Sequence, residues 1–155
     1  MPIFAPRQYA FSAHSSSGST NLNASDKVAF NELTNSFGST SGWDNREGGF
    51  DTTNHKYVAP VTGLYYFCVH MYFHSNNSGN VCAIVPRINN SQLHNGNDTI
   101  FFFAVTYIGG DYATGGGLYL ELTSGDDLTV HKRTGNSGTN RYYGAHSHFQ
   151  GHFIG

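Results

Sequence analysis

Histidines are the side chains of this sequence best suited to bind a metal ion, and the chain of 155 residues contains nine of them. His146, His148 and His152 lie near the C-terminus, where the period of two in a β-strand places them on one face with Gln150. Imidazole ligands suit zinc or nickel, and a threefold axis would bring three copies of one histidine to a single ion. Ordinary polar residues in a strand that crosses a partly polar interface give the same pattern, and we favour that interpretation.

Catalytic motifs are not evident in the rest of the sequence. A jelly-roll metalloenzyme would need a glutamate and a further histidine at fixed spacings after His148, but Phe149-Gln150-Gly151 follows instead. Asp126 and Asp127 are adjacent, so their carboxylates would point to opposite faces of a strand, and turn formation explains Asp126 better. The sequence contains no nucleophile motif and no phosphate-binding loop, so we predict a protein that is not an enzyme.

Ligand binding is expected in the loops, because loops on a rigid scaffold commonly carry function. The candidate loops are residues 75–80, 89–97 and 134–143. Arginine, amide and tyrosine side chains are combined in the last loop and the residue before it: Arg133, Asn136, Asn140, Arg141, Tyr142 and Tyr143. This mixture suits stacking on sugar rings and hydrogen bonding to their hydroxyls, although a solvated loop has the same composition.

The composition favours short strands joined by turns and narrows the range of partners. Aromatic residues make up 15% of the chain and charged residues 12%, where about 25% charged residues is usual. The net charge of −2, without a basic run, provides no surface for nucleic acid or an acidic membrane. No segment reaches the roughly 18 apolar residues of a membrane span, and residues 1–7 lack the apolar core of a secretory signal. Cys68 and Cys82 are expected to be buried free thiols rather than a disulfide.

One predicted strand is apolar on both faces. It begins at Gly63 and is expected to extend to about Phe73, with Tyr65 and Phe67 on one face and Tyr66 on the other. An antiparallel strand normally has one polar face, so a second subunit is the simplest cover for the outer face of this one. The pattern therefore predicts an oligomer.

Strand-like runs separated by Gly, Asn, Ser and Thr recur along the whole chain. They include residues 27–30 and the apolar run 99–108, which is expected to be buried. Pro86 favours a sheet edge or a bulge for its strand, and Gly125 and Asp126 are expected to start a hairpin turn. Without helical periodicity, the pattern predicts a single all-β domain over residues 1–155, with a core of about 9–154, folded as an antiparallel sandwich or jelly roll.

Several ordered motifs carry a resemblance to a known family. They are the stretch from Gly48 to Phe67, the Gly-Gly-x-x-Leu-x-Leu-x-x-Gly-Asp-x-Leu-x-Val pattern of residues 116–130, and Ser147 to Phe153. Residues 10–13, Ala-Phe-Ser-Ala, also look like the family's first strand. Together these motifs resemble the globular head of complement C1q, in the superfamily shared with tumour necrosis factor, over almost the whole chain.

The resemblance implies a jelly roll of two packed sheets that assembles as a homotrimer. Leu118, Leu120 and Leu122 would then face the core. The residues expected to face neighbouring subunits are Tyr66, Cys68, Tyr119 and Glu121. We expect the two tyrosines to contribute most of the interface, because aromatic side chains bury large areas. A monomer with an aromatic-rich core is the alternative.

Calcium is a second possible ligand that the resemblance implies. Some members of the family hold calcium near the trimer apex, and Asp111 lies in the matching segment of this chain. A second acidic residue is not evident, because Phe101-Phe102-Phe103 precedes this segment. Calcium prefers six to eight oxygen ligands, so one carboxylate from each subunit would supply few of the ligands it needs.

These observations predict a non-enzymatic, trimeric recognition or adhesion head that binds a cell-surface glycan or protein. Two settings fit such a head: a secreted protein, or the distal receptor-binding domain of a viral or phage fibre. The expected location is therefore extracellular or on a virion surface, with neither nucleic acid nor membrane insertion involved. A structural trimerisation cap for a stalk, with no ligand of its own, is the alternative.

Overall fold

The computed structural model describes residues 9–16, 18–33, 45–46, 49–74, 81–93, 100–106, 110–134 and 138–155. Within these ranges the chain contains strands and turns and no helix. The strands form two antiparallel sheets, with seven strands in one and six in the other. Among the described residues no helix long and apolar enough to cross a membrane occurs.

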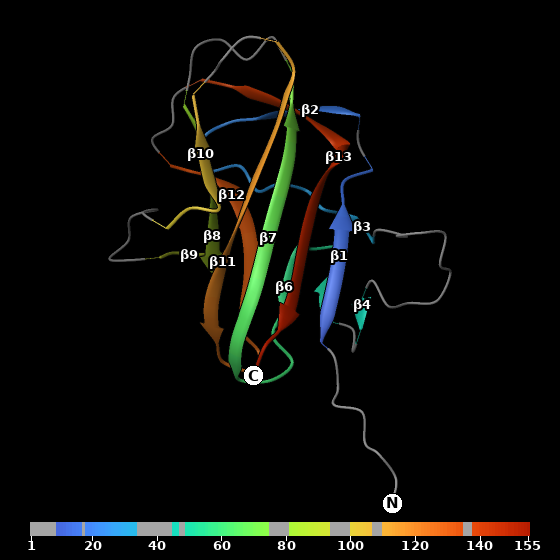
Figure 1. Cartoon of the computed structure of the whole chain (residues 1–155), viewed down its shortest axis with the longest axis vertical. Helices are drawn as coiled ribbons and strands as arrows, with labels where there is room; N and C mark the ends of the chain where they lie inside the picture. Colours follow the sequence, from blue (N-terminus) through green and yellow to red (C-terminus); the bar gives the residue numbers. More distant parts are fainter. Residues whose placement is uncertain are drawn as a thin grey trace, which may run out of the picture.

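The seven-stranded sheet is built around three long neighbouring strands, which run side by side through Figure 1. Its order is β11-β7-β13-β1-β3, while β2 pairs with β13 and β4 pairs with β1. The strand bounds are β1 (Ala10–His14), β2 (Ser19–Leu22), β3 (Glu32–Leu33), β4 (Asn45–Arg46), β7 (Gly63–Phe73), β11 (Tyr112–Leu122) and β13 (Asn140–Phe153). The pairing of β1 with β13 joins the two ends of the described chain in one sheet.

The six-stranded sheet packs against the first and has the order β10-β8-β12-β6-β5, with β9 paired to β8. Its strands are β5 (Phe50–Asp51), β6 (Lys56–Val58), β8 (Cys82–Ile88), β9 (Ser91–Gln92), β10 (Phe103–Val105) and β12 (Asp127–Lys132). Pro86 lies in the interior strand β8, opposite Val130, and not at a sheet edge. Its missing N–H is tolerated because the pairing with β10 reaches only Ile84 and the pairing with β9 begins at Arg87.

The core between the two sheets is mainly aromatic. Phe11 stacks on Phe50 and Tyr57 at ring-centroid distances of 4.8 and 4.7 Å, and its ring meets Phe149 edge-on at 4.8 Å. All four of these side chains are buried. The buried Tyr65 hydroxyl donates a hydrogen bond of 2.6 Å to the carbonyl of Val61, which satisfies its polar end.

Strand β7 confirms the period of two that its sequence predicts. Tyr65, Phe67, Val69, Met71 and Phe73 are fully buried, while the alternating residues between them are half-buried or exposed. The three leucines of β11 also point inward as expected, since one is buried and two pack partly buried against the core: Leu122, Leu118 and Leu120. The fold class expected from the sequence is therefore confirmed.

A register shift in β13 separates its two pairings with β7. The shift lies between Tyr143 and His148. Ser147 occupies this interval: its hydroxyl donates to the Tyr143 carbonyl at 2.7 Å and accepts from the Tyr72 N–H at 3.2 Å. The buried serine thus satisfies backbone groups that the irregular ladder leaves unpaired.

Some sequence-based expectations about local structure are wrong. Residues 27–30 form no strand, and only Lys27 makes an isolated bridge, to His131. In the described part of the apolar run 99–108, residues 100–106, Ile100 and Phe101 are exposed and Phe102 is buried, so this part is only partly buried. The turn at Gly125 does not form a hairpin, because it connects β11 in one sheet to β12 in the other. Both cysteines are free thiols as predicted, and Cys68 is only half-buried.

Candidate functional site: the outer face of the seven-stranded sheet

Side chains of β11, β7, β13 and β1 that point away from the core form a surface that we call the outer face. Tyr66 on β7 lies in register between Tyr119 on β11 and His152 on β13. Its ring centroid is 5.1 Å from that of Tyr119 and 5.6 Å from that of His152. Tyr119 is 64% exposed. We call these three side chains the aromatic row.

A glycine on β11 allows Tyr66 to lie against the sheet. A Cβ atom at Gly117 would meet the ring and hydroxyl of Tyr66, so a larger residue there would displace that side chain. Gly117 pairs with Cys68 in the neighbouring strand. Burial raises the pKa of the half-buried Cys68 thiol, which therefore stays protonated at neutral pH. The aromatic row therefore has an uncharged thiol beside its central tyrosine.

A second set, the histidine row, crosses the outer face further along the strands. His148 on β13 pairs with His14 on β1 and with His70 on β7. The ring centroids of His14 and His148 are 6.1 Å apart, and His14 Nε2 lies 3.2 Å from Oε2 of Glu32 on β3. The pKa of His148 is lowered, first by burial and then by the charges of His14, His70 and His146.

A third set, the tyrosine–histidine cluster, lies beyond the histidine row and contains Tyr72, Tyr143, His146 and His74. The Tyr143 ring is 4.2 Å from His74, 5.6 Å from His146 and 6.2 Å from Tyr72, measured between centroids. Asp111 adjoins this cluster, with one carboxylate oxygen 3.7 Å from His74 Nδ1 and the other 3.5 Å from the Tyr72 hydroxyl. Aromatic rings therefore continue over the outer face on both sides of the histidine row.

The four residues expected at a subunit interface all lie on the outer face. Tyr66 and Tyr119 are neighbours in the aromatic row, and Cys68 follows Tyr66 on the same face of β7. Glu121 is exposed at the end of β11. It lines a shallow hollow of about 490 Å³ together with Thr62, Gly63, Leu64, Leu122, Thr123 and Gly155.

The residues expected to bind a ligand do not form a single site. Asn140 and Tyr142 are each 1% exposed, so neither side chain is open to a ligand in one copy of the chain. They are buried because β13 already begins at Asn140, where the sequence analysis expected a loop. Burial also raises the pKa of Tyr142.

The other candidate ligand-binding residues have different neighbours. The Arg133 guanidinium lies over the Phe101 ring, 5.5 Å from its centroid. Arg141 is half-buried and pairs with Asn21 on β2, while Tyr143 belongs to the tyrosine–histidine cluster. Asn136 lies outside the described residues.

The candidate metal ligands are also separated within one protomer. His148 and His152 are four residues apart on one strand, a span of about 13 Å, which is too long for one ion. Asp111 has a phenol and an imidazole beside it, which does not fit the oxygen-rich shell of calcium. In the part of the chain that the structure describes, no group of three His, Cys, Asp or Glu side chains is arranged to hold a metal.

Sequence reasoning missed His14 and His70 as partners of His148. The period of two places His70 on the same face as Tyr66, so its outward direction is readable from the sequence. That it meets a histidine on β13 depends on the register of two distant strands, which the sequence alone does not reveal.

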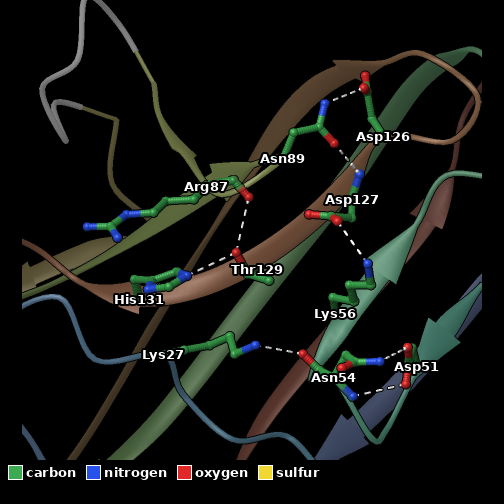
Figure 2. A network of polar contacts seen from close by, with 10 residues as sticks. All are labelled: Lys27, Asp51, Asn54, Lys56, Arg87, Asn89, Asp126, Asp127, Thr129 and His131. Atoms are coloured by element: carbon green, nitrogen blue, oxygen red, sulfur yellow. Dashed lines mark hydrogen bonds and ion pairs between the residues drawn. The ribbon is translucent and has the colours of Figure 1, made fainter.

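The outward side of the six-stranded sheet carries a polar network, shown in Figure 2. Lys56 Nζ lies 2.9 Å from a carboxylate oxygen of Asp127. The backbone N–H of Asp127 donates a hydrogen bond of 3.0 Å to the side-chain oxygen of Asn89. Asn89 in turn donates to Asp126 at 2.7 Å. The Thr129 hydroxyl shares a hydrogen bond of 3.0 Å with Nε2 of His131. Polar groups on this side thus bond to one another.

Solved structures with the same arrangement of strands define the class of fold. The Eiger TNF of S. frugiperda is similar with a TM-score of 0.69 at 14% identity, covering 96% of this chain and 94% of that one. The globular domain of zebrafish complement 1qA is similar with a TM-score of 0.60 at 18% identity, covering 96% and 98%. The fold is therefore the jelly roll of the C1q and TNF proteins.

The family follows from the sequence profile of the C1q domain, which matches residues 10–154. The chain belongs to the C1q domain family, as its motifs led us to expect. Comparison with curated proteins finds no significant relative. Domains of the C1q and TNF families are typically trimeric ligand-binding heads without enzymatic activity.

Proposed function

We propose that this chain is a non-enzymatic recognition head that works as a homotrimer. In the proposed assembly, the outer face of each copy packs against its neighbours, and segments at the ends of the sheets bind a ligand on a surface. The setting would be extracellular or on a virion. A trimer there could bind several copies of a repeated ligand at once, which raises its avidity.

The aromatic row is the single observation that carries the trimer. Tyr119 is 64% exposed although its ring lies beside that of Tyr66, so one copy alone leaves a large aromatic surface in water. Tyrosines of this kind are enriched among residues that dominate subunit interfaces. A neighbouring copy that covered the row would remove this apolar area from water.

The oligomeric state tests the trimer directly. Light scattering coupled to size exclusion is expected to give about three times the 16.9 kDa of one chain. Tyr119→Asp is expected to yield monomers, because it would bury three carboxylates in the interface. Val81→Asp is a matched control, since Val81 is an exposed apolar residue that precedes β8 of the other sheet. A monomeric wild-type protein, or equal loss of trimer in both variants, would contradict the proposal.

Ligand binding is proposed for the ends of the sheets, where Arg133 and Phe101 lie together. An arginine against an exposed ring suits a sugar or an acidic protein segment, because an aromatic face can stack on a sugar ring and a guanidinium can bind a carboxylate. A glycan array probed with wild-type protein and with Arg133→Ala tests this site. Loss of signal with an intact trimer is the expected result.

A structural cap is the second candidate function. It is favoured because Arg133 lies over Phe101 while Tyr143 belongs to the tyrosine–histidine cluster, so the described candidate residues form no single built ligand site. A trimer that binds neither glycans nor cell surfaces, in wild type and in Arg133→Ala alike, would support the cap and exclude the recognition role.

A further inference from the structure

We propose that the histidine row makes the association of copies depend on pH. Copies would associate while the imidazoles of His14, His70 and His148 are neutral, and would separate when acid protonates them. This inference rests on the trimer proposed above, and it goes further because it assigns a role to side chains that the trimer itself does not require.

The geometry of the row is the basis of the proposal. Three histidines occupy one register line on the neighbouring strands β1, β13 and β7, about 5 Å apart from strand to strand. His146 lies near enough to influence the charge of His148. The three side chains of the row lie on the outer face, between the aromatic row and the tyrosine–histidine cluster, to which His146 belongs. Covering this face would therefore take the whole group out of water.

Few opposite charges lie beside the row. Glu32 on β3 faces His14 at 3.2 Å, whereas His148 and His70 have no carboxylate beside them among the described residues. The titratable neighbours of His70 on its own face of β7 are Cys68 and Tyr72.

The strands beside the row contribute no further opposite charge. Gly115 faces His70 from β11, and the acidic residues of β11 and the turn before it, Asp111 and Glu121, lie about 13 and 20 Å from that glycine along the chain. Arg46 on β4 holds the register position opposite Ala10, four residues before His14. Protonation would therefore place like charges side by side with a single adjacent carboxylate.

The pKa of His148 is shifted in the direction that dissociation in acid requires. Its pKa in the folded protein is lowered by burial and by the other histidines, so the folded protein binds a proton less readily than the unfolded chain. The stability contributed by the neutral form is complete above the unfolded value of about 6.5 and is lost as the pH falls below it. Burial in an interface would lower the pKa further and couple the same protonation to dissociation.

The test is the mass of the full chain at about pH 8 and about pH 5, measured by light scattering over a range of concentrations. We expect trimers at the higher pH and at least a roughly tenfold higher concentration for half-dissociation at the lower pH. The double variant His70→Gln/His148→Gln is expected to remain trimeric at both values. Because His148 is half-buried, the single variant at the exposed His70 provides a second test, with a partial effect.

His55→Asn serves as the matched control. His55 lies in the turn between β5 and β6 with a φ of 52°, a conformation that asparagine also adopts. This control is expected to dissociate in acid as the wild type does. A trimer that persists unchanged at about pH 5, or a double variant that still dissociates there, would overturn the inference.

Two results separate this inference from the trimer itself. A monomer at about pH 8 would overturn the proposed trimer and this inference together, whereas a trimer whose mass is the same at both pH values would overturn this inference alone. Acid dissociation accompanied by loss of the β-sheet circular dichroism signal would place the sensitivity in the fold, and it would also overturn the inference.

Discussion

On the six-stranded sheet, outward polar groups find partners within the chain, whereas on the seven-stranded sheet the outward groups are rings that lie open to solvent. Lys56 and Asp127 form an ion pair, and Asn89 joins Asp126 to Asp127. Tyr119 and Tyr66 instead contact each other and leave their outer surfaces uncovered. Under the proposed trimer the two faces have different surroundings: one is complete in a single copy, and the other would be covered by a neighbouring copy.

The difference shows where sequence changes should affect stability and where they should affect assembly. Changes within the polar network should lower the stability of one copy and leave association intact. Changes on the outer face should weaken association and leave the single copy folded. The experiments below measure the stability of one copy, its association with other copies, or a single contact within the polar network. They run from the largest expected effect to the smallest.

Adjacent glycines on β11 provide the sharpest separation. A Cβ at Gly116 would meet the carbonyl of Phe102, whose N–H is fixed by a hydrogen bond of 2.9 Å to Ile84. Because backbone atoms cannot move away cheaply, Gly116→Ala should lower the free energy of unfolding by about 3 kcal/mol. Urea denaturation at fixed protein concentration measures this loss, and an unchanged midpoint would contradict the expected clash.

Gly117→Ala is the counterpart on the outer face. Its Cβ would push against the ring of Tyr66, which can rotate away at little cost to the fold. Displacing the ring should cost the assembly about 2 kcal/mol, or roughly thirtyfold in association, with the unfolding midpoint of the monomer unchanged. Sedimentation equilibrium measures the association, and undiminished trimer formation would show that Tyr66 is not part of the contact.

Thr129→Val tests the buried part of the polar network. The Thr129 hydroxyl is 3.4 Å from the Arg87 carbonyl and 3.0 Å from His131 Nε2, and the residue is 5% exposed. Valine keeps the shape but removes these bonds, so the free energy of unfolding should fall by about 1.5 kcal/mol. The mass at neutral pH should stay that of the wild type. A change in mass would show that the polar network also affects association, which would contradict the proposed difference between the two faces.

The Lys56–Asp127 ion pair should contribute little. Its side chains are 29% and 25% exposed, so water screens much of the attraction at 2.9 Å. A double-mutant cycle with Lys56→Gln and Asp127→Asn should give a coupling of about 0.5 kcal/mol that shrinks when salt is raised. A coupling above about 2 kcal/mol would show that the pair is far better shielded than its exposure indicates.

Asp126 should show the smallest effect, and one best seen by titration. Its pKa is lowered, first by the hydrogen bond from the Asn89 side chain and then by the N–H of Thr123. The resulting stabilisation is present above the unfolded pKa of about 3.9 and is lost as the pH falls through the folded value. NMR titration should show a higher Asp126 pKa in Asn89→Ala, and an identical value would exclude that hydrogen bond as the cause.

Local alternation explains what could be predicted from the sequence. The period of two shows that Tyr65 and Phe67 lie on one face of β7 and Tyr66 on the other, and the structure agrees. The resemblance to the family implied that the leucines of β11 face the core, and the structure agrees there too. The fold class follows from these strands together with the family motifs.

Long-range pairing explains what could not be predicted. Tyr142 looks like a loop residue in the sequence, but its pairing with Thr20 and Phe73 draws it into the sheet and the core. The meeting of His148 with His14 likewise depends on a register that joins the two ends of the described chain. Turn residues at Gly125 predict a reversal correctly, but only the packing of two sheets decides which sheet the next strand enters.

The pairing of β1 with β13 also has a consequence for the time course of folding. Five residues of the first strand, Ala10–His14, hydrogen-bond to a partner more than 130 positions later, and β13 also supplies the inner neighbour of β7. A nascent chain therefore cannot close its central sheet until synthesis has reached β13. Such non-local closure favours refolding in milliseconds to seconds rather than microseconds, and it leaves the edge of β7 open during translation.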